Sequence, residues 1–273
     1  MTLHQALKEA QKKLQKSCER PQFEAELLLA HHLGKERTYL ILHPDEAVED
    51  IAGFEALVAR RAKHEPYEYI VGKASFYDVH LKVAPGVLIP RPETELLIDH
   101  AAKIIEEERL TSLAEIGVGS GAISIMLARK FPHLYIIATD ICDMPLKIAA
   151  QNAKELGVGD RIALRKSNLL DEVSESVEIV VSNPPYIAED ALLEANVAEY
   201  EPKEALFGGR VGDELLKQII LEVKQRGIRW LVCEMGYDQK MPIQAFVNEV
   251  GVKSITFYKD LAGHDRGFVI AFF

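Results

Sequence analysis

Four consecutive residues, Asn183-Pro184-Pro185-Tyr186, could together hold a planar NH2 group and present its nitrogen to an electrophile. They follow residues 177–182, an apolar run that predicts a buried strand. Two successive prolines stop both strand pairing and helix formation, so the chain must leave the sheet as an extended loop. Ligands bind beyond the carboxyl ends of strands in open α/β sheets. We therefore expect this loop to line a ligand site.

The chemistry that suits this loop is direct methyl transfer to nitrogen. The side-chain oxygen of Asn183 and the backbone carbonyl of Pro184 could each accept one N–H of the NH2 group, and the Tyr186 ring could stack on its plane. Positive charge that builds on the nitrogen would then lie beside two oxygen dipoles already in place. We expect Asn183, Pro184 and Tyr186 to be catalytic, and the whole loop, Pro185 included, to bind the substrate.

A glycine-rich turn indicates the cofactor. Glycines alternate between a predicted strand at 113–116 and a predicted helix at 121–131, where they let the backbone turn tightly and approach a ligand at the start of the helix. The spacing is G-x-G-x-G rather than the G-x-G-x-x-G of dinucleotide sites, which disfavours a pyrophosphate. The turn residues expected to contact the cofactor are Gly117, Val118, Gly119, Ser120 and Gly121.

Two further polar residues follow neighbouring predicted strands. Asp140 ends the second strand, where a carboxylate can accept hydrogen bonds from both hydroxyls of a ribose. Asn168, after the third strand, is placed to reach an adenine. Because an adenosine without a pyrophosphate indicates S-adenosylmethionine, we predict this cofactor, with S-adenosylhomocysteine as the product. Asn183 is expected to contact it as well.

Glu234 and the cluster His264-Asp265-Arg266 are weaker candidates for the site. Glu234 follows the fifth predicted strand, where it could line the pocket or form a solvated strand end. The cluster lies between the last two predicted strands, which favours a turn with a salt bridge over a catalytic group. The nine histidines show no metal-binding spacing, so we expect no metal site.

Composition and charge limit the class of protein. The chain has 273 residues and a net charge of −10, which disfavours a general nucleic-acid binder because such proteins present a basic surface. Its three cysteines are far apart in the sequence, which favours a reduced, cytoplasmic setting. The N-terminal residues lack the apolar core of a signal peptide, and no segment has the ~20 apolar residues of a membrane span.

The elements that must position these residues fall into three parts. Residues 1–70 show helical spacing only and predict a small all-α bundle, suited to docking a substrate. Residues 71–92 alternate in hydrophobicity around Pro85-Gly86, which predicts a β-hairpin linker. From 93 to 273, strands alternate with helices. This predicts a seven-stranded, doubly wound, Rossmann-like α/β domain whose last strand is antiparallel.

With these motifs in place, the chain resembles the bacterial release-factor glutamine methyltransferases, the PrmC or HemK family. The specific match is the Ile-Pro-Arg-Pro-Glu-Thr-Glu segment at 89–95, since Asn-Pro-Pro-Tyr also occurs in DNA adenine methyltransferases. Further matches lie at 117–121, 181–187, 201–209 and 260–266. An aspartate is usual in the family at the position of Glu115.

The resemblance implies N5-methylation of the glutamine in the Gly-Gly-Gln loop of class I peptide-chain release factors. From the composition we expect a cytoplasmic enzyme that has no membrane contact and binds no nucleic acid directly. Two alternatives remain open at this stage. One is a DNA adenine-N6 methyltransferase, which the acidic charge disfavours because phosphate contacts dominate DNA affinity. The other is a cofactor-binding protein without transferase activity, against which the two complete motifs argue.

Overall fold

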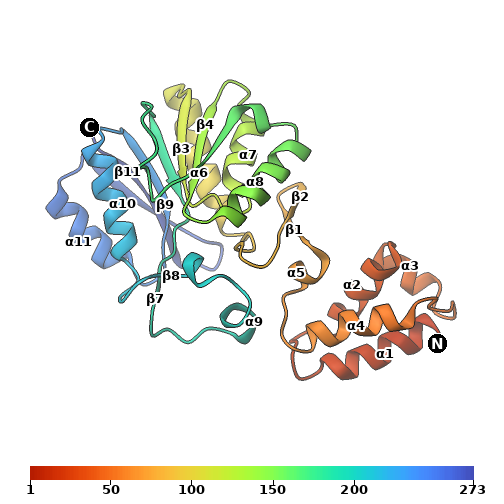
Figure 1. Cartoon of the computed structure of the whole chain (residues 1–273). Coiled ribbons are helices and arrows are strands. Elements are labelled where there is room, and N and C mark those ends of the chain that lie inside the picture. The colour runs from red at the N-terminus through yellow and green to blue at the C-terminus, as the bar shows by residue number, and fades with distance from the viewer. The chain divides into compact units, whose positions relative to one another are not determined.

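The computed structural model describes all residues, 1–273, and the chain divides into two compact units. The helical unit comprises Met1–Lys73 and Leu193–Tyr200. The sheet unit comprises Ala74–Leu192 and Glu201–Phe273. A short segment of the long loop after the Asn-Pro-Pro-Tyr motif, Leu193–Tyr200, therefore belongs to the helical unit. Figure 1 labels the elements of both units.

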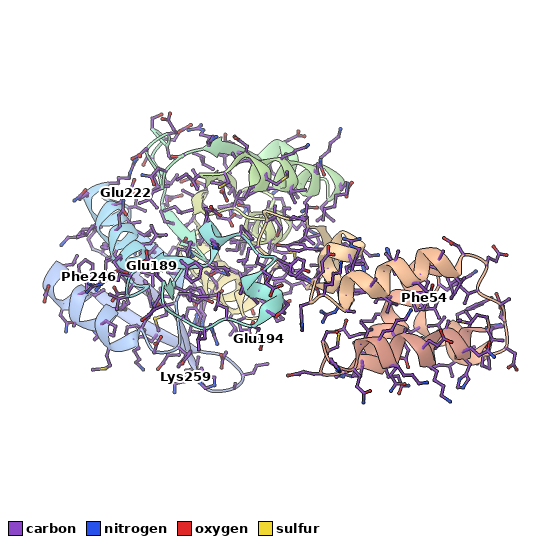
Figure 2. The ribbon with its side chains drawn as sticks, turned by 60° about the horizontal axis from the view of Figure 1, so that its bottom comes forward. Phe54, Glu189, Glu194, Glu222, Phe246 and Lys259 are labelled. Atoms are coloured by element: carbon purple, nitrogen blue, oxygen red, sulfur yellow. The ribbon has the colours of Figure 1, made fainter.

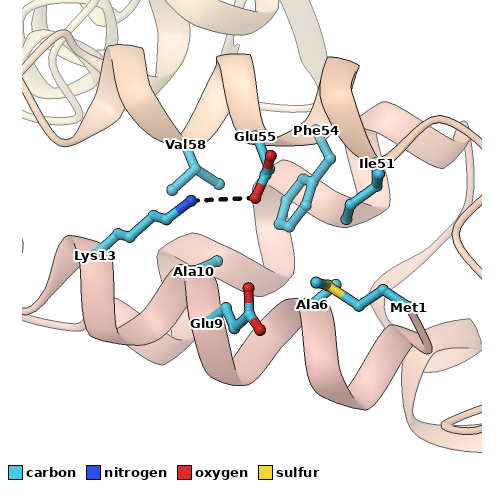
Figure 3. Close-up of a pocket in the computed structure, with 9 residues that line it drawn as sticks. All are labelled: Met1, Ala6, Glu9, Ala10, Lys13, Ile51, Phe54, Glu55 and Val58. Atoms are coloured by element: carbon cyan, nitrogen blue, oxygen red, sulfur yellow. Dashed lines mark hydrogen bonds and ion pairs between the residues drawn. The ribbon is translucent and has the colours of Figure 1, made fainter.

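The helical unit packs short helices around one apolar core. Thr2 begins the first helix with a capping box, in which its side chain and that of Gln5 each bond the other's backbone N–H. Phe54 is 1% exposed, and Figure 3 shows it among apolar side chains of the first and fourth helices, beside the Lys13–Glu55 ion pair (3.2 Å). The helices are α1 Leu3–Leu14, α2 Pro21–Leu33, α3 Arg37–Leu42, α4 Ile51–Arg61, α5 Tyr67–Val71 and α9 Ala195–Ala198.

The segment that contains α9 was not expected from the sequence. Tyr200, at the end of the segment, donates a hydrogen bond to the backbone carbonyl of Lys63 (2.6 Å). This bond connects the segment to the rest of the helical unit. Figure 2 shows Glu194 at the start of the same segment. The four-residue length of α9 explains why no helical periodicity marks it.

The β-hairpin is present, but its turn differs from the prediction. Strands β1 Lys73–Phe76 and β2 Val79–Lys82 are joined at Tyr77, which has a φ of 47°. Two hydrogen bonds hold this left-handed residue, because its N–H donates to the Glu95 carboxylate (2.9 Å) and its hydroxyl donates to the Glu95 carbonyl (2.8 Å). Pro85-Gly86 therefore lies in irregular backbone after the hairpin and does not form its turn.

The main sheet has seven strands in the order β10-β11-β9-β6-β3-β4-β5. The pairs β9-β6, β6-β3, β3-β4 and β4-β5 are parallel, whereas the last strand, β11, is antiparallel to both β10 and β9, as predicted. The strands are β3 Ser112–Ile116, β4 Tyr135–Asp140, β5 Ile162–Lys166, β6 Ile179–Ser182, β9 Trp230–Glu234, β10 Ser254–Lys259 and β11 Asp265–Ala271. A separate parallel pair, β7 Ile187–Ala188 and β8 Phe207–Gly209, was missed because both strands are very short.

Helices cover both faces of the sheet, as Figure 1 shows, so the fold is doubly wound as predicted. Alternate residues of each strand enter opposite apolar cores: in β3, Leu113 packs with α6, α7 and α8, whereas Ala114 packs with α10 and α11. None of the helices combines the length and apolar character needed to cross a membrane. The helices are α6 Thr94–Glu108, α7 Ala122–Lys130, α8 Asp143–Glu155, α10 Glu214–Gln225 and α11 Lys240–Val250.

Candidate active site

A cavity of about 290 Å³ lies at the carboxyl ends of four adjacent strands, β6, β3, β4 and β5. This is the edge at which the sequence placed a ligand site. The predicted residues that line the cavity are Gly117, Gly119, Asp140, Asn168, Asn183, Pro184 and Pro185. The predicted residues that do not line it are Val118, Ser120, Gly121 and Tyr186.

The glycine turn exposes two of its glycines to the cavity. The backbone N–H groups of Gly117 and Val118 both donate to the Thr139 carbonyl at the end of β4 (2.9 Å each), which fixes the turn against the neighbouring strand. Gly119 has a φ of 54° and no other residue within 4 Å of the position a Cβ would take. The turn therefore leaves open space at Gly119 for a ligand to approach the backbone.

The other residues of the turn hold it in place. Val118 packs in the apolar core, and Ser120 is buried as well. Gly121 has a φ of 86°, and a Cβ there would lie 2.9 Å from Ile125 and 3.3 Å from Ala149 of α8. Gly121 thus lets α7 and α8 pack closely, and direct contact of Val118, Ser120 and Gly121 with a cofactor stays a prediction.

Asp140 is fixed by the backbone on both sides. Its Oδ2 accepts a hydrogen bond from the Gly119 N–H (3.2 Å) and its Oδ1 accepts one from the Cys142 N–H (3.0 Å). Burial raises the pKa of this carboxyl, and the backbone hydrogen bonds oppose the rise. Each carboxylate oxygen can accept more than one hydrogen bond, so Asp140 can receive further hydroxyl donors without losing its position.

Asn168 lines the opposite side of the cavity, after β5. Its Nδ2 donates to Asp171 Oδ2 (3.2 Å). The next residue, Leu169, has a φ of 47° and is buried, so the chain turns there and adds an apolar wall. The contact of Asn168 with an adenine stays a prediction.

The Asn-Pro-Pro-Tyr loop begins directly after β6. At the end of that strand, Ser182 Oγ donates a hydrogen bond to the Ile116 carbonyl of β3 (2.8 Å). Asn183 then directs its Nδ2 to Thr94 Oγ1 (3.0 Å). Tyr186 directs its hydroxyl to Glu234 Oε1 (3.0 Å) and away from the cavity. The stacking of the Tyr186 ring on a substrate therefore stays a prediction, while its hydroxyl anchors the end of the loop.

Two glycines after β7 allow the loop to pack closely. A Cβ at Gly208 would lie 2.4 Å from the Pro185 carbonyl oxygen, and a Cβ at Gly212 would lie 2.5 Å from the Tyr186 carbonyl oxygen. Gln239 also donates from Nε2 to that Tyr186 carbonyl (2.8 Å). Gly208 lies within 201–209, so the glycine of that segment allows the close approach to Pro185.

Glu234, one of the weaker sequence candidates, is buried and does not line the cavity. It accepts hydrogen bonds from Thr94 Oγ1 (2.8 Å) and from the Tyr186 hydroxyl. Of the 264–266 cluster, Arg266 forms an ion pair with Asp260 (2.8 Å) and Asp265 one with Lys240 (3.1 Å), as the interpretation of a turn with a salt bridge expected.

Sequence reasoning missed two residues that organise this edge of the sheet. Thr94 links Asn183 to Glu234, and buried Glu201 accepts the Ile89 N–H (3.2 Å) and pairs with Arg91 (2.5 Å). Both Thr94 and Glu201 lie in segments that carried the family resemblance, which was the available signal. Their contacts join positions more than eighty residues apart, which spacing alone does not reveal.

The residues around the cavity fit S-adenosylmethionine. Gly119 leaves room beside a carboxylate with unused acceptor capacity, and apolar side chains supply walls for a planar base. The apolar wall residues include Leu88, Ile116, Ile141, Leu169, Phe207 and Leu215. No group of three or more His, Cys, Asp or Glu side chains is arranged to hold a metal ion.

Comparison with known proteins defines the class first. The Methyltransferase small domain family model matches residues 92–200, and the PrmC N-terminal domain model matches residues 5–72. A crystal structure of the hMettl16 catalytic domain in complex with MAT2A 3'UTR hairpin 6 is similar with a TM-score of 0.58 and 20% identity, over 71% of this chain and 75% of that one. At this identity the likeness shows the fold alone, which is that of a Rossmann-like methyltransferase.

Sequence relatives then define the family. A protein of Vibrio cholerae named release factor glutamine methyltransferase is 35% identical over 97% of this chain and 95% of its own length. Proteins with the same name from Coxiella burnetii and Mycolicibacterium smegmatis are 35% and 37% identical, over 97% and 90% of this chain and 97% and 89% of their own lengths. The chain belongs to the release factor glutamine methyltransferase family.

Proposed function

We propose that this protein transfers a methyl group from S-adenosylmethionine to the side-chain amide nitrogen of the glutamine in the Gly-Gly-Gln loop of class I peptide-chain release factors. One observation carries the proposal. Asn183 and Pro184 line the same cavity as Gly117, Gly119 and Asp140, so a group held by the Asn-Pro-Pro-Tyr loop lies next to the volume that suits the cofactor. Family membership supports the choice of a release-factor glutamine as the group that is held.

Residues of the glycine side would hold the cofactor. Asp140 would accept hydrogen bonds from the ribose hydroxyls, the backbone at Gly117 and Gly119 would approach the amino-acid part, and Asn168 would lie at the base. When bound, S-adenosylmethionine supplies a methyl group on a positively charged sulfur.

Residues of the Asn-Pro-Pro-Tyr loop would hold and activate the glutamine amide. The Asn183 side-chain oxygen and the Pro184 carbonyl oxygen form no hydrogen bond within the chain, so both can accept an N–H of the substrate. Their dipoles stabilise the positive charge that develops on the amide nitrogen, and they favour its pyramidal form. After the methyl bond has formed, the nitrogen carries a positive charge and loses one proton to water. We assign docking of the release factor to residues 1–70, which lie within the helical unit.

A competition assay tests the proposal. The protein is incubated with S-adenosylmethionine carrying a labelled methyl group, together with a class I release factor and an adenine-containing DNA duplex. We expect label only in the release factor, and mass spectrometry should place it on the glutamine. A release factor with that glutamine replaced by alanine is the matched control and should stay unlabelled. Label in the DNA would support the adenine alternative, and label in neither substrate would contradict both.

A further inference from the structure

One buried carboxylate, Glu234, holds both ends of the Asn-Pro-Pro-Tyr loop. Its Oε2 accepts from Thr94 Oγ1 (2.8 Å), which in turn accepts from Asn183 Nδ2 (3.0 Å) at the first residue of the loop. Its Oε1 accepts from the Tyr186 hydroxyl (3.0 Å) at the last residue. Thr94 and Glu234 are 4% and 1% exposed, so this chain of hydrogen bonds is shielded from water.

The direction of these hydrogen bonds decides whether the oxygen or the NH2 group of the Asn183 amide faces Thr94. An ionised carboxylate has no proton to give, so Thr94 must donate its single hydroxyl proton to Glu234. The Thr94 oxygen is then left with lone pairs only, and it can bond only the NH2 end of the Asn183 amide. The carbonyl end of that amide consequently faces away from Thr94 and is free to accept a hydrogen bond.

We propose that Thr94 and Glu234 are positioning residues that fix the Asn183 amide with its oxygen available to the substrate NH2 group. The inference rests on the proposed function, in which that oxygen accepts an N–H of the glutamine. If the amide were reversed, its own NH2 would meet the substrate NH2, and two donors would face each other. The reversed amide therefore cannot orient the nitrogen.

The surroundings of Glu234 make this arrangement sensitive to pH. Burial raises the pKa of Glu234, while the hydrogen bonds from Thr94 and Tyr186 and the charge of Arg266 oppose the rise. A protonated Glu234 could donate to Thr94, whose hydroxyl could then donate to Asn183 and favour the reversed amide. The other titratable groups that face Glu234 from the packed elements are Glu93, Cys233 and Tyr258.

The experiment compares Thr94→Val with Thr94→Ser in the full-length protein, with a release factor as substrate. Valine keeps the shape of threonine but has no hydroxyl, whereas serine keeps the hydroxyl. We expect Thr94→Val to lower kcat about 10- to 100-fold, because a misplaced acceptor costs that order of rate. Thr94→Ser should recover most of the loss. The Kd for S-adenosylhomocysteine, measured by calorimetry, should change by no more than about threefold in either variant.

Glu234→Gln supplies the second measurement. We expect kcat of the unmodified protein to fall as the pH is lowered through the Glu234 pKa. In Glu234→Gln, which has no carboxyl group to protonate, we expect this fall of kcat at low pH to be absent. The inference would be overturned if Thr94→Val kept the kcat of the unmodified protein. It would also be overturned if kcat of Glu234→Gln still fell at low pH as it does in the unmodified protein. Absence of turnover by the unmodified protein would instead contradict the proposed function, so the two failures are distinct. Circular dichroism and the melting temperature check that each variant is folded.

Discussion

The glycine turn at 117–121 and the Asn-Pro-Pro-Tyr loop at 183–186 meet at one cavity, but different forces hold them. Backbone hydrogen bonds to Thr139 and close helix packing at Gly121 hold the glycine turn. Side chains hold the Asn-Pro-Pro-Tyr loop, through Thr94 and Glu234. The first arrangement presents bare backbone and open space to a ligand, whereas the second presents an oriented amide.

A buried glutamate lies behind each loop, and the two differ in their partners. Glu115, behind the glycine turn, accepts from the N–H (3.0 Å) and the hydroxyl of Ser124 in α7. Glu234 accepts from hydroxyl groups that lead directly to the Asn-Pro-Pro-Tyr loop, and the charge of Arg266 lies near it. Changes on the glycine side should therefore affect cofactor affinity or stability, and changes on the other side should affect turnover.

The largest effect is expected for Asn183→Ala. This change removes the side-chain oxygen that would accept a substrate N–H, and loss of one such oriented group costs about 10²- to 10³-fold in kcat. We expect that loss in single-turnover assays at saturating cofactor, with the Kd for S-adenosylhomocysteine raised by no more than about fivefold.

Asn248→Ala is the matched control for this variant. Asn248 lies exposed on α11 and bonds only Gln244 (3.0 Å), so its removal should leave kcat unchanged. If Asn183→Ala weakened cofactor binding as strongly as it lowered kcat, the separation of roles between the two loops would be wrong.

A smaller effect, of the opposite kind, is expected for Asp140→Asn. Both oxygens of Asp140 accept backbone N–H groups, so the new NH2 group would face a donor and the remaining oxygen could serve only one of them. We expect the Kd for S-adenosylmethionine to rise about 10- to 100-fold, with kcat at saturating cofactor within about threefold of the unmodified value.

Asp143→Asn provides the control, because Asp143 is exposed and pairs only with Lys166 (2.8 Å) on the surface. It should leave the cofactor Kd unchanged. A fall in kcat with an unchanged Kd in Asp140→Asn would show that the glycine side contributes to turnover directly.

Much of the fold follows from local pattern. The alternation of strands and helices after residue 93 predicted the seven-stranded sheet and its antiparallel last strand. The hairpin turn was misplaced because Pro85-Gly86 is a strong turn signal, whereas Tyr77 adopts its left-handed backbone through tertiary bonds to Glu95. At this hairpin the long-range hydrogen bonds to Glu95 determine the position of the turn, and the local turn preference of Pro-Gly does not.

Short motifs were enough to indicate Asn183 and Asp140, and both residues line the cavity, while their roles stay predictions. The supporting residues could not be derived from spacing. Glu234 is 1% exposed and satisfied by Thr94 and Tyr186, and those contacts exist only after three distant segments have come together. The orientation of Tyr186 likewise depends on the buried carboxylate below it, so its side chain turns away from the cavity that its neighbours line.

The last expected effect distinguishes the two glutamates and concerns stability rather than turnover or cofactor binding. Burial raises the pKa of Glu115 to about 8, although the hydrogen bonds from Ser124 oppose the rise. An acid whose pKa is raised on folding binds its proton more tightly in the folded state, so its contribution to stability is full below about pH 4.5 and is lost as the pH rises through about 8.

Glu115→Gln keeps an acceptor for Ser124 but cannot ionise. From urea unfolding at pH 6 and pH 9, we expect its free energy of unfolding to gain about 2–3 kcal/mol relative to the unmodified protein over that range. Glu107→Gln, at an exposed position of α6, should show no such gain, and an equally flat difference for Glu115→Gln would mean that Glu115 is already ionised in the folded protein.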